Sequence, residues 1–160
     1  ADGSIHVIDY KTGGKSSYRK ISETTPDDHG QYLQLPIYGL AARAAVATPD
    51  TAVHGQYWFV TDAGAHIGHP LSEAVLTRFD TVLTTIIDGI ETGLFPARPP
   101  KDSRFGIGCD YCDPDGMGTD AVAASWEKKR TDPALEPYRR LIGDLDEVAG
   151  AVTDLGDHDG

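Results

Sequence analysis

Two stretches, IHVIDYKTG at residues 5–13 and QLPIYGLAA at residues 34–42, decide how the fold of this sequence is interpreted. In the first stretch, β-branched and aromatic residues alternate in a two-residue period around Ile5 and Val7, and a Thr-Gly-Gly turn signal follows. The pattern predicts a β-strand with an acid, Asp9, close to its carboxyl end.

The second stretch has the spacing of a helix. Apolar residues recur at Leu33, Ile37 and Leu40 and continue through an alanine-rich run to about Ala47. Pro36 then falls in the first turn, where a missing N–H leaves no hydrogen bond broken. A strand, a polar loop and a helix therefore follow one another.

Further strands are expected after that helix. Residues 54–61, HGQYWFVT, are aromatic and β-branched, and a short third strand is expected around residues 66–68 after an Ala-Gly turn. Trp58 and Phe59 are interpreted as core or near-site packing, with a stacking platform for single-stranded DNA as the alternative.

The clearest helical pattern begins at Leu71. Ser72 is placed to cap this helix and Gly93 to end it. Apolar residues at spacings of three and four mark one face: Val75, Leu76, Phe79, Leu83, Ile86, Ile87 and Ile90. Shorter helices are predicted at residues 121–129 and 134–145.

The length of 160 residues suits one domain with an appendage. We place the main domain at residues 1–118 and a helical acidic extension at residues 119–160. No run approaches the roughly 18 apolar residues that span a bilayer, and no signal peptide is recognisable. A soluble protein is expected. The chain starts at Ala1 rather than Met, so we expect a fragment whose first elements are missing.

The formal net charge of −11 argues against simple electrostatic attraction to a phosphate backbone. The charge is unevenly distributed, however. Six acids and no Lys or Arg lie in residues 141–160, whereas no acid lies between residues 10 and 22, where four cations cluster: Lys11, Lys15, Arg19 and Lys20.

Asp9 and Lys11 are two residues apart on the predicted strand, so both side chains project from one face. A phosphodiester hydrolase needs a carboxylate to hold Mg²⁺ or Mn²⁺ and a cation or base near the attacking water. Asp9 would supply the carboxylate, and Lys11 would supply the cation or base. From the tripeptide alone, a surface ion pair remains the alternative.

The order D-Y-K-T-G, then Q-x-x-x-Y at Gln34 and Tyr38, resembles the RecB/AddB-type nucleases of the PD-(D/E)XK superfamily. The resemblance runs from about residue 3 to residue 117. It implies a restriction-endonuclease-like α/β fold, with a mixed sheet flanked by helices.

The resemblance also implies roles for these residues. Asp9 would be a metal ligand, and Lys11 would position or activate the water and stabilise charge on the phosphate. Gln34 and Tyr38, at i and i+4 on one helical face, would order the site and contact DNA. Without the resemblance, a partly buried polar pair at a helix start is the alternative. The family's further aspartate and its acid or histidine on an earlier helix would lie upstream of Ala1.

The function implied is Mg²⁺-dependent hydrolysis of DNA, exonucleolytic, within a repair or recombination system that includes a helicase domain or subunit. The rival hypothesis is a catalytically silent nuclease-like domain that binds DNA or a helicase as a scaffold.

Two cysteines, Cys109 and Cys112, are too few for a disulfide framework, and a reducing, cytoplasmic setting is expected. Relatives of the AddB type bind a [4Fe–4S] cluster through four cysteines. Here Gly118 stands where the last of these would be, so we expect no normal cluster. The pair is interpreted as a remnant of cluster ligands, with a zinc or redox pair as alternatives.

Overall fold

The computed structural model describes residues 3–46, 51–61, 63–98 and 119–144. The chain divides into two compact units, Ala1–Thr84 and Thr85–Gly160. In order, its elements are β1 (Ile5–Lys11), a 3₁₀ turn η1 (Ser16–Tyr18), α1 (Gln34–Val46), β2 (Val53–Phe59), β3 (Ala65–Pro70), α2 (Glu73–Glu91), α3 (Thr119–Lys129), a second 3₁₀ turn η2 (Pro133–Leu135) and α4 (Glu136–Leu141).

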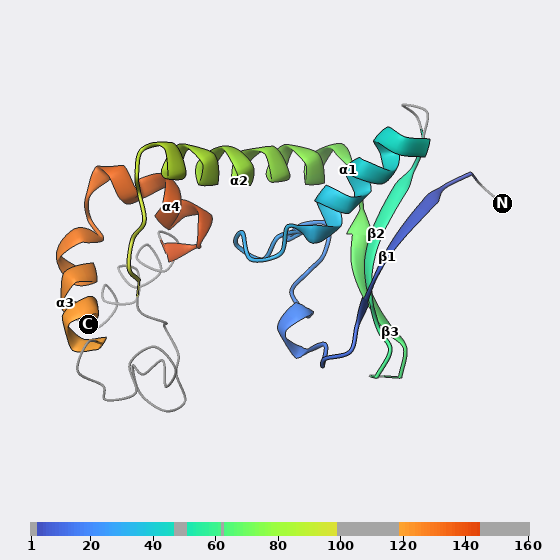
Figure 1. The fold of residues 1–160 in the computed structure, drawn as a ribbon, viewed down its shortest axis with the longest axis horizontal. Helices are drawn as coiled ribbons and strands as arrows, with labels where there is room; N and C mark the ends of the chain where they lie inside the picture. The colour runs from blue at the N-terminus through green and yellow to red at the C-terminus, as the bar shows by residue number, and fades with distance from the viewer. Residues whose placement is uncertain (1–2, 47–50, 62, 99–118, 145–160) are drawn as a thin grey trace, which may run out of the picture. The chain divides into compact units, whose positions relative to one another are not determined.

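The first unit is built on a three-stranded sheet in the order β1-β2-β3 (Figure 1). β1 runs parallel to β2, with Asp9 opposite Tyr57 and Lys11 opposite Phe59. β3 runs antiparallel to β2. The chain passes through α1 between the two parallel strands, as a parallel connection requires. This mixed sheet flanked by helices confirms the predicted α/β, restriction-endonuclease-like fold class.

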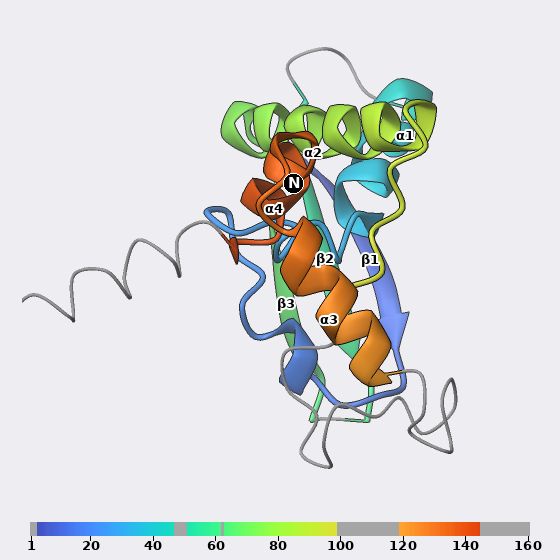
Figure 2. The ribbon, with the colours of Figure 1, turned by 90° about the vertical axis from the view of Figure 1, so that its left-hand side faces the viewer.

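Helix α1 packs on one face of the sheet, in contact with both β1 and β2 (Figures 1 and 2). Gly55 on β2 makes the close approach possible, because a Cβ atom there would lie 3.0 Å from the Cβ of Leu35. Leu35 and Pro36 are buried at this contact, and Pro36 lies in the first turn of the helix as predicted.

Two clusters of buried side chains form the core of this unit. One contains Ile21, Leu35, Tyr57 and Phe59, and the other contains Val53, Leu71 and Val75. The alternation of β2, with every second residue buried from Val53 to Phe59, directs these side chains toward α1 and leaves the intervening ones on the opposite face.

Asp27 organises the polar loop between β1 and α1. Its carboxylate receives two hydrogen bonds from the Arg78 guanidinium, at 3.1 and 2.9 Å, and one from the Gly30 N–H at 2.9 Å. The next two residues, Asp28 and His29, have φ of 40° and 61°, left-handed values that aspartate and histidine tolerate better than most residues. The loop is therefore tied to α2 by a buried carboxylate.

Helix α2 begins and ends near the predicted residues. Ser72 precedes it, and its hydroxyl accepts a long hydrogen bond, 3.4 Å, from the Val75 N–H. At the other end Gly93 has φ of 72°, and the Leu94 N–H donates to the Gly89 carbonyl at 2.7 Å. This is the hydrogen-bond pattern of a Schellman C-cap, which satisfies carbonyls that the helix leaves without partners.

The second unit contains α3 and α4 (Figure 2). The helix predicted at residues 134–145 is shorter, because the Asp132 carboxylate caps η2 and Gly143, with φ of 72°, follows the end of α4. Buried Asp144 pairs with Arg139 at 3.1 Å and with Arg98 at 3.6 Å.

None of the described helices is both long enough and apolar enough to cross a bilayer. The division into domains at residues 1–118 and 119–160 remains a prediction.

Candidate active site

The candidate site lies at the carboxyl end of β1. Asp9 and Lys11 project from the same face of this strand, the face that α1 covers, and their side chains are only 16% and 21% exposed. The Lys11 Nζ lies 3.1 Å from Asp9 Oδ2. This ion pair is therefore largely withdrawn from water, unlike the surface pair that the tripeptide alone allowed.

Gln34 is the first residue of α1, and the packing of Leu35 against Gly55 brings it over the end of β1. The Lys11 ammonium donates a hydrogen bond of 2.9 Å to Gln34 Oε1. Three of the four residues predicted for the site thus meet at one ammonium group, although Gln34 is 23 residues from Lys11 in the sequence.

Two aromatic rings complete the surroundings of Lys11. The Nζ lies 4.9 Å from the centre of the Tyr57 ring and 5.9 Å from that of Tyr18. The faces of such rings attract cations. Because carboxylate, amide and rings converge on it, the ammonium is held in one place.

Tyr38, the fourth predicted residue, lies one turn along α1 from Gln34 and is 44% exposed. Within the described residues it makes no hydrogen bond to the other three. Its phenol is close enough to contribute to the raised pKa of Tyr57. The structure therefore brings Asp9, Lys11 and Gln34 into contact and leaves Tyr38 beside them, accessible to a ligand.

Tyr57 is a residue that the sequence interpretation missed. It is fully buried, and its hydroxyl has no hydrogen-bond partner among the described residues. Burial raises the pKa of the phenol well above its usual value, and the negative charge of Asp9 raises it further. The hydroxyl therefore keeps its proton at neutral pH. The aromatic pattern of HGQYWFVT predicted a strand that contains Tyr57. Only the register of β2 with β1 shows that Tyr57, rather than a neighbouring residue, lies beside Asp9.

The Asp9 oxygen that faces Lys11 lacks a hydrogen bond. This atom, Oδ2, is buried and makes no hydrogen bond among the described residues, although it forms the ion pair with Lys11. The site thus holds an acceptor and a donor, Asp9 Oδ2 and the Tyr57 hydroxyl, that are both ready for a partner.

Trp58 and Phe59, the two residues after Tyr57, lie on opposite faces of the sheet. Phe59 is fully buried in the core, as expected. Trp58 lies on the opposite face of the sheet, where its ring is 5.3 Å from that of Tyr10 and 4.9 Å from that of His66. Trp58 is therefore part of an aromatic row across three strands, and it does not face Lys11.

A metal ion would have one protein carboxylate here. No group of three or more His, Cys, Asp or Glu side chains suited to a metal occurs in residues 3–46, 51–61, 63–98 or 119–144. Cys109 and Cys112 lie outside the described residues. Mg²⁺ commonly binds one or two carboxylates and takes its other ligands from water and substrate phosphates, so a single carboxylate fits.

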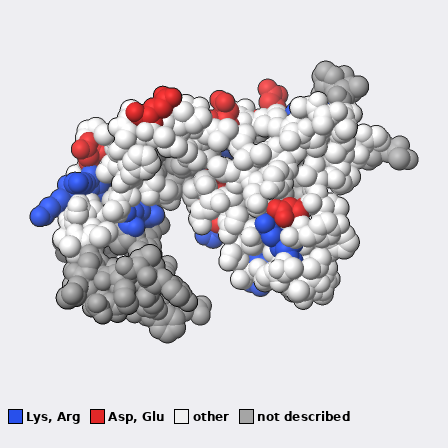
Figure 3. Space-filling model, viewed as in Figure 1, with Lys and Arg blue, Asp and Glu red and all other residues white. Residues whose placement is uncertain are grey.

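Figure 3 shows acidic side chains along the outer side of α2. Those of this helix are Glu73, Asp80, Asp88 and Glu91, all exposed. The Lys and Arg residues near β1 lie instead in the loop that follows it, where Arg19 and Lys20 are exposed directly after η1. Since Tyr18 of η1 faces the Lys11 ammonium, this basic segment adjoins the site.

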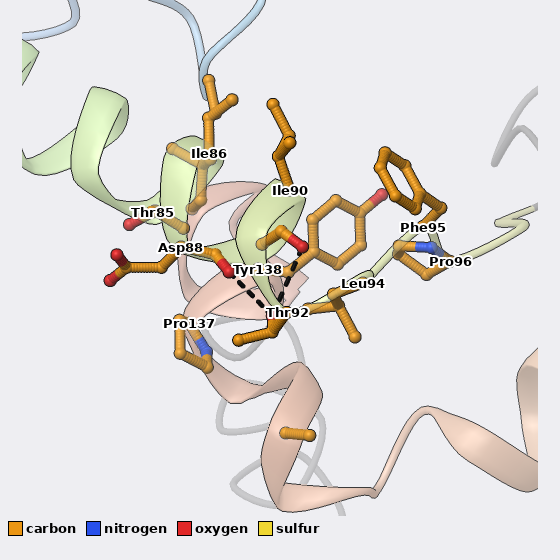
Figure 4. Close-up of a pocket in the computed structure, with 13 residues that line it drawn as sticks. Thr85, Ile86, Asp88, Ile90, Thr92, Leu94, Phe95, Pro96, Pro137 and Tyr138 are labelled. Carbon is orange, nitrogen blue, oxygen red and sulfur yellow. Dashed lines mark hydrogen bonds between the residues drawn. The ribbon is translucent and has the colours of Figure 1, made fainter.

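The second unit contains a cavity of about 800 Å³ between the end of α2 and α4 (Figure 4). Its lining is mostly apolar and includes Ile86, Leu94, Phe95 and Tyr138. Thr92 does not offer its hydroxyl to the cavity as a free donor, since it bonds to the Asp88 and Gly89 carbonyls. The cavity has no set of groups for phosphodiester chemistry, and we place the candidate site at β1.

A family model described as the PD-(D/E)XK nuclease superfamily matches residues 1–115, which include every residue of the candidate site. Comparisons with curated proteins and with solved structures give no match.

Proposed function

Because the chain belongs to the PD-(D/E)XK nuclease superfamily, we propose that it hydrolyses DNA phosphodiester bonds at Asp9, Lys11 and Gln34 with the help of Mg²⁺ or Mn²⁺. One observation carries the proposal. The Lys11 ammonium is held between Asp9 Oδ2 at 3.1 Å and Gln34 Oε1 at 2.9 Å, on a strand end that α1 partly covers.

Asp9 would hold the metal. A carboxylate is a ligand type that Mg²⁺ prefers, and waters and the substrate phosphate would complete the coordination. A metal held there would supply Lewis-acid polarisation of the phosphoryl group and would make a nearby water more acidic.

Lys11 would supply a fixed positive charge. Charge builds up on the phosphate oxygens during attack, and a cation that is already in place stabilises it without reorganisation. Its contacts with Gln34 and the rings of Tyr57 and Tyr18 keep the long side chain from adopting other rotamers. Gln34 therefore acts on the reaction through Lys11, while exposed Tyr38 would contact the nucleic acid directly.

We also propose the finer function that the D-Y-K-T-G and Q-x-x-x-Y resemblance implies. The chain would be a RecB/AddB-type exonuclease that digests DNA from strand ends in repair or recombination, in association with a helicase domain or subunit. The motif resemblance alone supports this level of detail. Cys109 and Cys112 would be a remnant of cluster ligands.

A second candidate function is a nuclease-like scaffold that binds DNA or a helicase without cleaving. A specific observation favours it: in the described part of the chain, Asp9 does not belong to any group of three or more His, Cys, Asp or Glu side chains that could hold a metal ion. A scaffold would bind end-labelled DNA and leave it intact.

The test is Mn²⁺-dependent degradation of end-labelled single- and double-stranded DNA, with Lys11→Ala purified in parallel. We expect the substitution to lower the rate at least 100-fold, because removal of a single preorganised charge-stabilising donor costs about 10²–10³-fold. Lys128→Ala, at an exposed position of α3, is the matched control and should retain the wild-type rate.

Equal degradation by wild type and Lys11→Ala would show a contaminating nuclease and reject the assignment. Binding without degradation by the wild type would favour the scaffold.

A further inference from the structure

The buried hydroxyl of Tyr57 has no role in the packing of the first unit. The Tyr57 ring fills the core cluster with Ile21, Leu35 and Phe59, and a phenylalanine would fill it equally. The oxygen is withdrawn from solvent and has no hydrogen-bond partner among the described residues. A hydroxyl that costs free energy in a core implies a use beyond packing.

The hydroxyl is directed to the same face of the sheet as the candidate site. Tyr57 is the register partner of Asp9 across the parallel pair β1 and β2, and the Lys11 ammonium lies over its ring at 4.9 Å. The Asp9 Oδ2 atom is the other buried polar atom there without a hydrogen bond. A phenol donor and a carboxylate acceptor, neither with a hydrogen bond among the described residues, therefore lie on the same face of two neighbouring strands.

Chemistry limits what can satisfy both atoms. The carboxylate only accepts hydrogen bonds, and the protonated phenol donates one. A phosphate oxygen could accept from Tyr57 but would repel Asp9. A water molecule can accept from the phenol and donate to the carboxylate, so it suits both.

We propose that Tyr57 is a positioning residue of the site, and that its hydroxyl and Asp9 Oδ2 share one bound water that fixes the orientation of the Asp9 carboxylate. The effect on cleavage rests on the proposed function, whereas the shared water does not. Loss of a residue that orients a metal-ligating carboxylate typically lowers activity or metal affinity by about 10–100-fold.

The variant for the test is Tyr57→Phe, which removes only the oxygen. Tyr10→Phe is the matched control, because Tyr10 is the sequence neighbour of Asp9, lies on the opposite face of the sheet and is 61% exposed. We expect Tyr57→Phe to lower kcat about 10–100-fold with KM for DNA and the thermal midpoint unchanged. The Tyr10→Phe variant should match the wild type in kcat and midpoint.

A crystal structure of the metal-free full chain, at a resolution that shows ordered water, supplies a readout independent of activity. The expected result is a water within hydrogen-bond distance of both the Tyr57 hydroxyl and Asp9 Oδ2, displaced or disordered in Tyr57→Phe.

Density that shows no such water in the wild type overturns the proposal, whatever the cleavage assay gives. A water with an unchanged kcat in Tyr57→Phe overturns the positioning role. If the wild type has no nuclease activity, the proposed function fails, and the crystal structure and the Mn²⁺ affinity of Tyr57→Phe still test the water and its effect on Asp9. An unchanged affinity would then count against the positioning role.

Discussion

At the scale of single residues, Lys11 shows how a charged side chain is kept in a largely covered position. An ammonium that leaves water loses hydration, and here an ion pair, an amide oxygen and two rings compensate for that loss. Each of these partners comes from a different element or loop. The site therefore depends on a few side chains whose removal should affect chemistry more than folding.

Gln34 allows this expectation to be tested. Gln34→Ala removes the 2.9 Å acceptor of Lys11. We expect the cleavage rate to fall about 10–100-fold, because the ammonium loses a partner that orients it. The free energy of unfolding should change by less than about 0.5 kcal/mol, because the side chain of Gln34 is exposed. Single-turnover cleavage and urea unfolding measure the two quantities.

Gln31→Ala, an exposed glutamine three residues earlier, is the control and should leave both quantities unchanged. A wild-type cleavage rate for Gln34→Ala would show that the hydrogen bond to Lys11 has no part in the reaction.

At the scale of elements, the distance between α1 and β2 determines whether Gln34 reaches Lys11. Gly55 sets that distance, because only a residue without a Cβ lets the backbone of β2 approach Leu35 so closely. A Cβ atom at position 55 would meet the Cβ and the carbonyl oxygen of Leu35, and neither of these atoms can rotate away.

Gly55→Ala should therefore displace the start of α1. The new Cβ would lie 3.0 Å from Leu35 Cβ and 3.4 Å from the Leu35 oxygen. We expect a loss of about 1–3 kcal/mol in the free energy of unfolding, the usual cost of overpacking. Cleavage should fall as well, because Gln34 moves with the helix. Denaturant unfolding and the cleavage assay check both.

Gly13→Ala is the control, since a Cβ at Gly13 meets nothing within 4 Å. A Gly55→Ala variant as stable and as active as Gly13→Ala would mean that α1 can shift without disturbing the site.

At the scale of the whole molecule, charge distribution matters more than net charge. The chain has a formal charge of −11, which repels a polyanion at long range. No acid lies between residues 10 and 22, however, and η1 holds this basic segment next to Lys11. DNA would be attracted locally, by Lys15, Arg19 and Lys20.

The salt dependence of DNA binding tests this. About three phosphate contacts predict a slope near −3 for the logarithm of the association constant against that of salt concentration. Removing two cations in Arg19→Ala/Lys20→Ala should reduce the slope by about 2. Fluorescence anisotropy at several salt concentrations, with Ca²⁺ in place of Mn²⁺ to suppress cleavage, measures it.

The pair Lys128→Ala/Lys129→Ala removes the same charge from the end of α3 and should leave the slope unchanged. Equal effects of the two double variants would mean that DNA responds to total charge and not to the segment beside the site.

Local patterns were sufficient for most of the fold and for part of the site. A period of two placed Asp9 and Lys11 on one face of β1, and a period near 3.6 placed Gln34 and Tyr38 on one side of α1. Ser72 and Gly93 marked the ends of α2 because capping is chemistry between near neighbours. The helix predicted at residues 134–145 was too long, since the η2 cap and the turn at Gly143 interrupt it.

The sequence by itself therefore determined the elements and the chemical types at the end of β1, because periodicity and capping act within a few residues. Only the tertiary structure decided which distant groups surround Lys11. The register of β1 with β2 selected Tyr57, the Gly55 contact brought Gln34 within 2.9 Å, and Arg78 found Asp27 across 51 residues. Those pairings depend on how whole surfaces pack, and no short-range pattern encodes that packing.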